Sequence, residues 1–451
     1  MDYQALKQQY LDLAGQVVAK AARQGALAEA YLTAGEELNI EVRNQEVEAL
    51  TTARDQGLGL RVIVDHRVGF AFTTDFSPAA LAACVEQALA NARMATPDEH
   101  NCLPARYPGY PQMDLWDPEI TTTPLAKKIE TAKEIERQAR TYDPRVKITE
   151  SCSYSDSRYL VVLANSQGIT AAYHAANCGA STFVVAVEND ESQTGFGLAY
   201  GLKLKNIDPV QVGREGAAKA VRMLGAKRVN TQRAAVVFDP YVATNFLGVI
   251  APALTADAVQ KGKSLFRGRV GRQVAAPVIN LIDDGRRPDG IASSPFDGEG
   301  VPTTHTVLIE KGVLNCYLHN TYTAARDGVT STGNGARGSF KTTPEVGTTN
   351  FYIEAGSRTP EEIIKEIPRG LYVTEVMGMH TANPISGDFS VGASGIWIEK
   401  GELTTPVRGV AIAGNIIGLL EVVDAVASDL TFFGATGAPT VRIASMTISG
   451  Q

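Results

Sequence analysis

The chain has 451 residues, of which 44% are hydrophobic and 20% charged, and its formal net charge is −7. This composition is typical of a globular protein with two or three domains and excludes a disordered or fibrous chain. The acidic balance disfavours nucleic acid as a partner, because a protein that binds many phosphates usually carries a basic face.

Cysteine usage and hydropathy both point to the cytoplasm. None of the five cysteines forms a CxxC pair, which argues against a disulfide framework or a zinc ribbon. The first twenty residues hold no uninterrupted apolar stretch, so we expect no signal peptide. The apolar run at residues 409–420 is shorter than the roughly 20 residues that a bilayer requires. We therefore expect a cytoplasmic protein with no membrane partner.

The first half predicts one series of elements twice. Residues 6–21 have the spacing of an amphipathic helix, alternating segments follow, and Ser77 with Pro78 begins a second helix. Beyond a proline-rich connector, a helix from Pro124, more strands and a helix from Pro209 repeat this order. The pattern of helix, about four strands and helix therefore predicts a duplication.

The second half predicts mostly strands and loops, with one helix after Pro240 and another near residues 359–367. Segments 307–314 and 396–403 each contain a Glu-Lys-Gly turn between two strands, which predicts hairpins and a largely antiparallel sheet. The expected fold class is α+β, with duplicated helix–antiparallel strands–helix units followed by a mostly antiparallel β domain with few helices. The expected parts are residues 1–96, a connector at 97–123, and domains at 124–229 and 230–451.

The segment SPFDGEGVPTTHTVL, residues 294–308, places two carboxylates and an imidazole beside two glycines. Asp297, Glu299 and His305 could form a metal site or an acid/base pair, or the stretch could be an ordinary turn before a strand. The spacing favours a glycine-rich turn in which Asp297 and Glu299 fix the backbone or orient a substrate. His305 remains the residue whose role is open.

Other motifs give weaker signals. No histidine pair fits HxxxH or HExxH, and no GxSxG occurs. Glu299, His305, Cys316 and His319 could assemble a metal site across strands, but we favour Cys316 in the core and His319 on a strand surface. GNGARG at residues 333–338 satisfies GxGxxG without a following helix, so a tight loop is favoured over a nucleotide site.

The basic segment at residues 261–272 carries five positive charges and no acid. We interpret it first as a solvated loop. The alternatives are a contact for an acidic partner or a peptide carboxylate, with DNA third.

Several long segments, taken in order, resemble the C-terminal domain of the TldD/PmbA family. They begin with SLFRGRVGRQV (264–274) and continue at residues 293–337, 374–403 and 414–443. ANSQGITAAY (164–173) is similar to the Asn-Ser-x-Gly segment of the family's central domain. The resemblance implies a cytosolic peptidase built as a TldD–TldE heterodimer that takes unfolded peptides as an added strand. The resemblance also implies an older name of the family, modulator of DNA gyrase, and a link of its peptidase to microcin maturation and antitoxin turnover.

The resemblance further implies two branches. TldD-type members bind zinc through an HExxxH helix and a later cysteine, and PmbA-type members, also called TldE, lack these residues. Here the segments NFLGVIAPALTADAVQKGK and DLTFFGATGAPT contain neither histidine nor cysteine. The resemblance therefore implies a PmbA/TldE-type subunit with no metal ligand and no catalytic residue of its own. Zinc is expected in a TldD-type partner, and the chain is expected to form a heterodimer with that partner or a homodimer.

Residues within the family motifs become candidates for binding substrate or partner. They are Asp297, Glu299, His305, Asn334, Arg337, His380, Asp388, Arg267 and Arg269. Two alternatives stay open: a stand-alone hydrolase that uses Asp297, Glu299 and His305, and a regulatory module that binds gyrase or nucleic acid through the basic segment.

Overall fold

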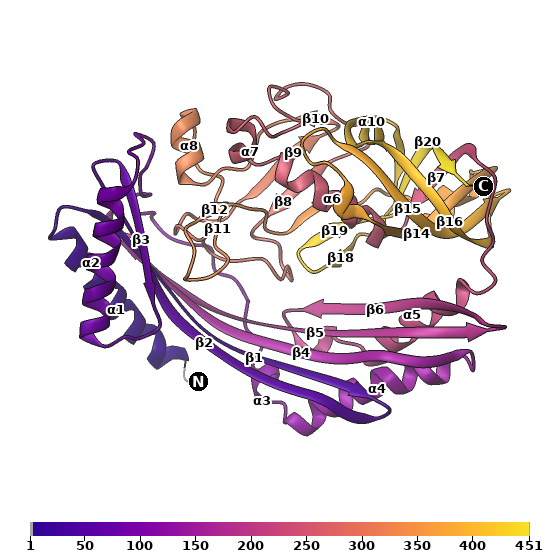
Figure 1. Ribbon diagram of the computed structural model, residues 1–451, viewed down its shortest axis with the longest axis horizontal. Helices are drawn as coiled ribbons and strands as arrows, with labels where there is room; N and C mark the ends of the chain where they lie inside the picture. The colour runs from indigo at the N-terminus through magenta and orange to yellow at the C-terminus, as the bar shows by residue number, and fades with distance from the viewer. Residues whose placement is uncertain (1–2, 451) are drawn as a thin grey trace.

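The computed structural model describes residues 3–450 and has the expected α+β architecture (Figure 1). A long, curved N-terminal sheet carries its helices on one face and turns the other face toward a sheet-rich C-terminal body (Figure 1). Within the described range, every helix is too short or too polar to cross a membrane.

Two units of the same order build the N-terminal half. The first consists of α1 (Tyr3–Ala22), β1 (Leu27–Arg43), β2 (Glu46–Val64), β3 (Arg67–Thr73) and α2 (Pro78–Met94). The second consists of α4 (Leu125–Tyr142), β4 (Val146–Asn165), β5 (Thr170–Glu188), β6 (Glu191–Gly201) and α5 (Pro209–Arg222), with a short 3₁₀ turn at Leu204–Asn206. The predicted duplication is confirmed, but each copy has three strands rather than about four. The difference arises because β1 and β2 run unbroken for 17 and 19 residues.

The two units share one sheet, because β1 of the first unit forms an antiparallel pair with β4 of the second. The strand order is β3-β2-β1-β4-β5-β6. The connector between the units contains a short helix, α3 (Pro118–Thr122), capped by Asp117. The predicted start of α2 is confirmed, since Ser77 Oγ accepts a hydrogen bond from the Ala80 N–H and Pro78 follows it.

Successive side chains along each strand point to opposite faces of this sheet. Ala30 and Leu32 of β1 and Leu160 of β4 are buried beneath the helices. The intervening residues, such as Tyr31 of β1 and Val161 of β4, pack with Phe296 and Phe340 of the C-terminal body. The concave face of the sheet therefore forms one wall of the boundary between the two halves.

The C-terminal body contains many short strands and few helices. Its first elements are β7 (Gln232–Phe238), α6 (Pro240–Ala253), α7 (Ala256–Gln260), β8 (Leu281–Asp284), β9 (His305–Glu310), β10 (Val313–Leu314) and α8 (Thr321–Asp327). Next come β11 (Gly335–Ala336), β12 (Glu345–Val346), β13 (Phe351–Ile353), α9 (Pro360–Lys365), β14 (Arg369–Met377) and a 3₁₀ turn at Met379–Thr381. The last are β15 (Asp388–Glu399), β16 (Glu402–Asn415), α10 (Ile416–Glu421), β17 (Val423–Val426), β18 (Thr431–Phe433), β19 (Thr436–Ala438) and β20 (Val441–Ser449).

These strands form two six-stranded sheets, ordered β10-β9-β8-β13-β19-β18 and β16-β15-β14-β7-β20-β17, and a small β11–β12 pair. Pairing between the named strands is antiparallel except at β13–β19 and β14–β7. Phe246 and Ile250 of α6 share one core with side chains from both large sheets, including Phe351 and Val373. Helix α6 thus joins the two sheets.

Both predicted hairpins are confirmed. β9 pairs with β10, and β15 pairs with β16, each across a Lys-Gly turn. Lys311 and Gly312 have φ angles of 46° and 80°, and Lys400 and Gly401 have 52° and 80°. Two successive positive φ angles are what a type I′ hairpin turn requires.

Candidate functional site

A buried ionic cluster of Glu29, Arg61, Glu299 and Arg337 joins the two halves of the chain. Arg61 Nη2 lies 3.0 Å from Glu29 Oε2 and 3.0 Å from Glu299 Oε1. Arg337 also pairs with Glu29, and the exposed fraction of each of these four side chains is at most 8%. Glu29 and Arg61 belong to β1 and β2, whereas the other two come from loops of the C-terminal body. Because isolated buried charges are costly, this mutual pairing fixes how the loops sit on the sheet.

Asp297 organises the glycine-rich turn beside this cluster. Its Oδ1 accepts hydrogen bonds from the N–H groups of Glu299 (2.8 Å) and Val301 (3.0 Å), and its Oδ2 accepts one from Gly335 N–H (2.7 Å). Glu299 Oε2 accepts a further bond from Thr321 N–H at 2.7 Å. Burial, and then the neighbouring Glu299 carboxylate, raises the pKa of Asp297. Both carboxyl groups therefore fix backbone in the folded molecule.

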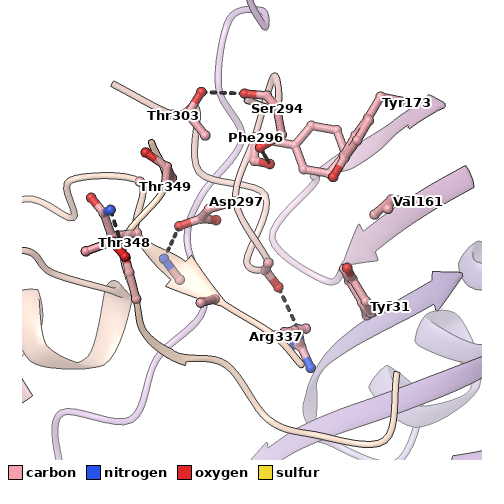
Figure 2. A pocket seen from close by; sticks show the side chains of 16 residues that line it. Tyr31, Val161, Tyr173, Ser294, Phe296, Asp297, Thr303, Arg337, Thr348 and Thr349 are labelled. Carbon is pink, nitrogen blue, oxygen red and sulfur yellow. Dashed lines mark hydrogen bonds between the residues drawn. The ribbon is translucent and has the colours of Figure 1, made fainter. Parts of the chain in front are cut away.

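A polar cavity of about 180 Å³ lies between this turn and the concave face of the sheet (Figure 2). Asn334 helps to build its wall, because its Nδ2 donates to Asp283 Oδ2 at 2.7 Å and to Gly347 O at 2.9 Å. Burial raises the pKa of Asp283 to about 6. The cavity is lined mainly by Tyr31, Val161, Tyr173, Ser294, Phe296, Asp297, Asn334, Arg337, Thr348 and Thr349.

His305 lies apart from the other two members of its motif. It begins β9 with half of its side chain exposed, and its Nδ1 is 3.0 Å from Asp284 Oδ2. Asp297 and Glu299 are instead turned toward backbone N–H groups and Arg61. The three residues do not come together as the acid/base group that a stand-alone hydrolase would use.

The remaining candidates are dispersed over the C-terminal body. His380 lies in the exposed 3₁₀ turn, and Asp388 at the start of β15 accepts a 2.9 Å hydrogen bond from Asn415 Nδ2. Arg267 is exposed and Arg269 half-buried in a turn ahead of β8. The structure thus brings Asp297, Glu299, Asn334 and Arg337 together and leaves the other five candidates elsewhere.

The expected position of His319 is wrong. The side chain is only 6% exposed and precedes α8 in a loop, not on a strand surface. The chain folds inward there, since Leu318 is fully buried and pairs with Thr255. Burial lowers the pKa of His319, while Cys316, expected in the core, is half-buried. Across residues 3–450, no three His, Cys, Asp or Glu side chains group as ligands for a metal ion.

Glu29 and Arg61 were not among the residues predicted from the sequence. Each lies within an apolar strand segment, LAEAYL for Glu29 and GLGLRVIV for Arg61. A charge inside such a segment is a signal that it must find a buried partner. The identity of that partner, 238 residues away for Arg61 and Glu299, comes only from the tertiary structure.

The fold places the chain in a class of α+β proteins in which a duplicated N-terminal sheet faces a two-sheet C-terminal body. Models of the PmbA/TldA metallopeptidase domain 1, central domain and C-terminal domain match residues 28–92, 118–224 and 231–450. The chain is 30% identical to the metalloprotease PmbA of Escherichia coli O157:H7 over 418 residues, covering 92% of this chain and 90% of that protein. The chain therefore belongs to the PmbA/TldD family, as its motifs indicate.

Solved structures share this fold over nearly the whole chain. A proposed modulator of DNA gyrase from Thermotoga maritima superposes with a TM-score of 0.91 and 26% identity, covering 98% of this chain and 100% of that one. TldE from Thermococcus kodakarensis has the same fold, with a TM-score of 0.90 and 24% identity, and the match covers 97% of this chain and 100% of that one.

Proposed function

We propose that this chain is a PmbA/TldE-type subunit of a cytosolic TldD/TldE-type metallopeptidase. In this role it binds unfolded peptides and completes a proteolytic chamber with a TldD-type partner, which supplies the zinc ion. The observation that carries the proposal is the side-chain chemistry of α6 and of the β18–β19 segment.

Helix α6, followed by the short helix α7, precedes the segment SLFRGR in the region where the TldD-type zinc helix is expected. Its residues, PYVATNFLGVIAPA, include no histidine, cysteine, aspartate or glutamate, the side chains that bind zinc. Phe246, Leu247 and Ile250 instead pack into the apolar core. The residues present on α6 do not fit a zinc ion.

The β18–β19 segment, where the family's later cysteine is expected, lies against the same helix. The rings of Tyr241 on α6 and Phe433 on β18 are 5.1 Å apart. Residues 429–440, which include these two strands, hold one carboxylate, Asp429, which accepts hydrogen bonds from the N–H and the Oγ1–H of Thr440 at 2.9 and 2.7 Å. Where α6 and this segment meet, the chain therefore has an aromatic pair and a carboxylate that already accepts two hydrogen bonds, and not a set of zinc ligands.

A sheet edge supports the peptide-binding part of the proposal. β18 is an end strand of its sheet, whereas the outer edge of β10, at the other end, is already hydrogen-bonded to residues 271–274. The free N–H and C=O groups of an end strand can pair with an extended peptide of almost any sequence. Such pairing suits a subunit that takes unfolded chains.

A cleavage assay tests the assignment. The chain alone, a TldD-type protein alone and their mixture are incubated with the same unstructured peptide, and products are measured by mass spectrometry. We expect substantial cleavage only in the mixture, and its loss when the zinc-binding histidines of the TldD-type protein are replaced by alanine. Cleavage by the isolated chain after dialysis against a chelator would overturn the proposal.

A further inference from the structure

A second cavity continues from the first along the concave face of the N-terminal sheet. It has a volume of about 440 Å³ and shares Tyr31, Val161, Tyr173 and Arg337 with the smaller one. We call it the tyrosine groove. Its lining includes Tyr31, Glu37, Asp55, Tyr159, Tyr173 and Arg337.

Three tyrosines dominate the apolar wall of the groove. The rings of Tyr159 and Tyr173 meet edge to face at 6.3 Å. Tyr31 lies beside them, only 9% exposed, with the Arg337 guanidinium 4.9 Å from its ring centre. Figure 2 shows Tyr31, Val161 and Tyr173 along the same side of the adjoining cavity.

The Tyr31 hydroxyl has no hydrogen-bond partner among residues 3–450, and it is not one of the side-chain atoms that are sealed from solvent. Tyr31 itself lines both cavities. The hydroxyl is therefore available to a ligand in the groove.

The free charge of the groove is negative. Glu37 and Asp55 are exposed on the same face as Tyr31 and have no ion pair among residues 3–450. Arg337 is already bound to Glu29, Gly298 O and Thr342 O.

The other charges near the groove are also engaged. Arg158 and Glu36, which also belong to the lining, pair with each other at 2.7 Å, and Arg54 pairs with the same carboxylate. Lys341, on the loop above the groove, stands 5.1 Å over the ring of Phe340 and is not part of the lining.

We propose that the tyrosine groove binds a basic segment of an unfolded peptide. Lysine or arginine side chains would pack on the tyrosine faces through cation–π contacts and pair with Glu37 and Asp55 at the mouth. The Tyr31 hydroxyl would bond to the peptide backbone or to a cationic group. This inference rests on the proposed function, because it names the substrate class that the subunit selects.

Direct binding to the isolated full-length chain tests the inference. Fluorescence anisotropy is measured with a labelled, end-blocked octapeptide that carries Lys-Arg at its centre, and with the same peptide carrying Gln-Gln. We expect the basic peptide to bind roughly three- to tenfold more tightly, with the difference shrinking as salt is added. The double variant Glu37→Gln/Asp55→Asn should abolish most of this preference, and Tyr31→Phe should weaken binding of the basic peptide.

Glu41→Gln is the matched control, since Glu41 lies on the same strand and face outside the lining. Equal affinity for the two peptides, or an unchanged preference in the double variant, would overturn the inference. Self-association that disappears in the double variant would also overturn it, in favour of a second copy's basic segment, residues 261–272. If partner-dependent cleavage persists while the basic preference is absent, only the groove is refuted and the proposed function stands.

Discussion

At the scale of single residues, the ionic cluster of Glu29, Arg61, Glu299 and Arg337 fixes the relation between the two halves. Its four side chains are almost fully buried, so each charge depends on the others for compensation. Removing one member leaves the opposite charge buried without its full set of partners. The cluster should therefore be far more sensitive to substitution than ion pairs on the surface.

Glu299→Gln tests this sensitivity. The substitution removes the negative charge that faces Arg61 and that accepts the Thr321 N–H. We expect the free energy of unfolding to fall by about 2 kcal/mol or more. Denaturant titration followed by circular dichroism measures it, with the exposed Glu99→Gln as control. An equal effect of the two substitutions would contradict the role assigned to the cluster.

Asp283 should make stability depend on pH. Burial raises its pKa from the usual 3.8 to about 6, so the folded state holds this proton more tightly than the unfolded chain. The stabilising contribution is complete below about pH 4 and is lost as pH rises through about pH 6. Asparagine does not titrate, so Asp283→Asn should remove up to about 3 kcal/mol of the decrease in unfolding free energy that accompanies this rise in pH. Denaturation midpoints are measured at several pH values for the unsubstituted chain and the Asp283→Asn variant. The same dependence of the midpoint on pH in both proteins would refute this prediction.

The contrast between Asp297 and Arg61 shows how far sequence alone reaches at this scale. The turn at Asp297 could be predicted because its partners Glu299 and Val301 are two and four residues away. The pairing of Arg61 with Glu299 spans 238 residues and depends on the packing of a whole loop on a sheet. Neither the composition of the chain nor the spacing of its residues predicts such a contact.

At the scale of elements, the loop after β11 anchors the C-terminal body to β2. Phe340 is fully buried in this contact, and glycines make room for it. A Cβ atom at Gly57 would lie 2.1 Å from the Phe340 ring, and one at Gly59 would lie 2.1 Å from Phe340 O. Any side chain at these positions must displace the loop.

Gly59→Ala should therefore lower stability by roughly 1–3 kcal/mol and expose the loop to protease. Gly15→Ala is the comparison, because a Cβ there meets nothing within 4 Å and the residue lies inside α1. Replacing a helical glycine by alanine should raise stability by about 0.5–1 kcal/mol. Thermal melts and limited proteolysis measure both, and a shift in the same direction for both variants would contradict this packing.

Elements with local signals were the ones that sequence predicted well. Ser77 and Pro78 began α2 as expected, and the two Lys-Gly turns formed hairpins. The number of strands was wrong in each N-terminal unit. In the first unit, Gly35 of β1 and Gly57 and Gly59 of β2 lie within continuous antiparallel pairing and do not end a strand. The inward fold that buries His319 had no local signal.

At the scale of the whole molecule, the long curved sheet and the C-terminal body enclose cavities that are polar or aromatic, and helix α6 offers no zinc ligand. Family membership could be predicted from long motifs in the right order. The boundary between the halves could not, because it combines β1, β4 and β5 with loops from residues 294–349. The proposed subunit role accounts for both the retained fold and the missing ligands.

The zinc content of the assembled complex tests this role most directly. The chain is mixed with a TldD-type partner, the complex is purified by size exclusion, and zinc and protein are measured by native mass spectrometry and elemental analysis. We predict one zinc ion per pair of chains, with none retained by this chain after the complex is separated. Two zinc ions per pair, or one zinc ion bound to the isolated and dialysed chain, would contradict the account.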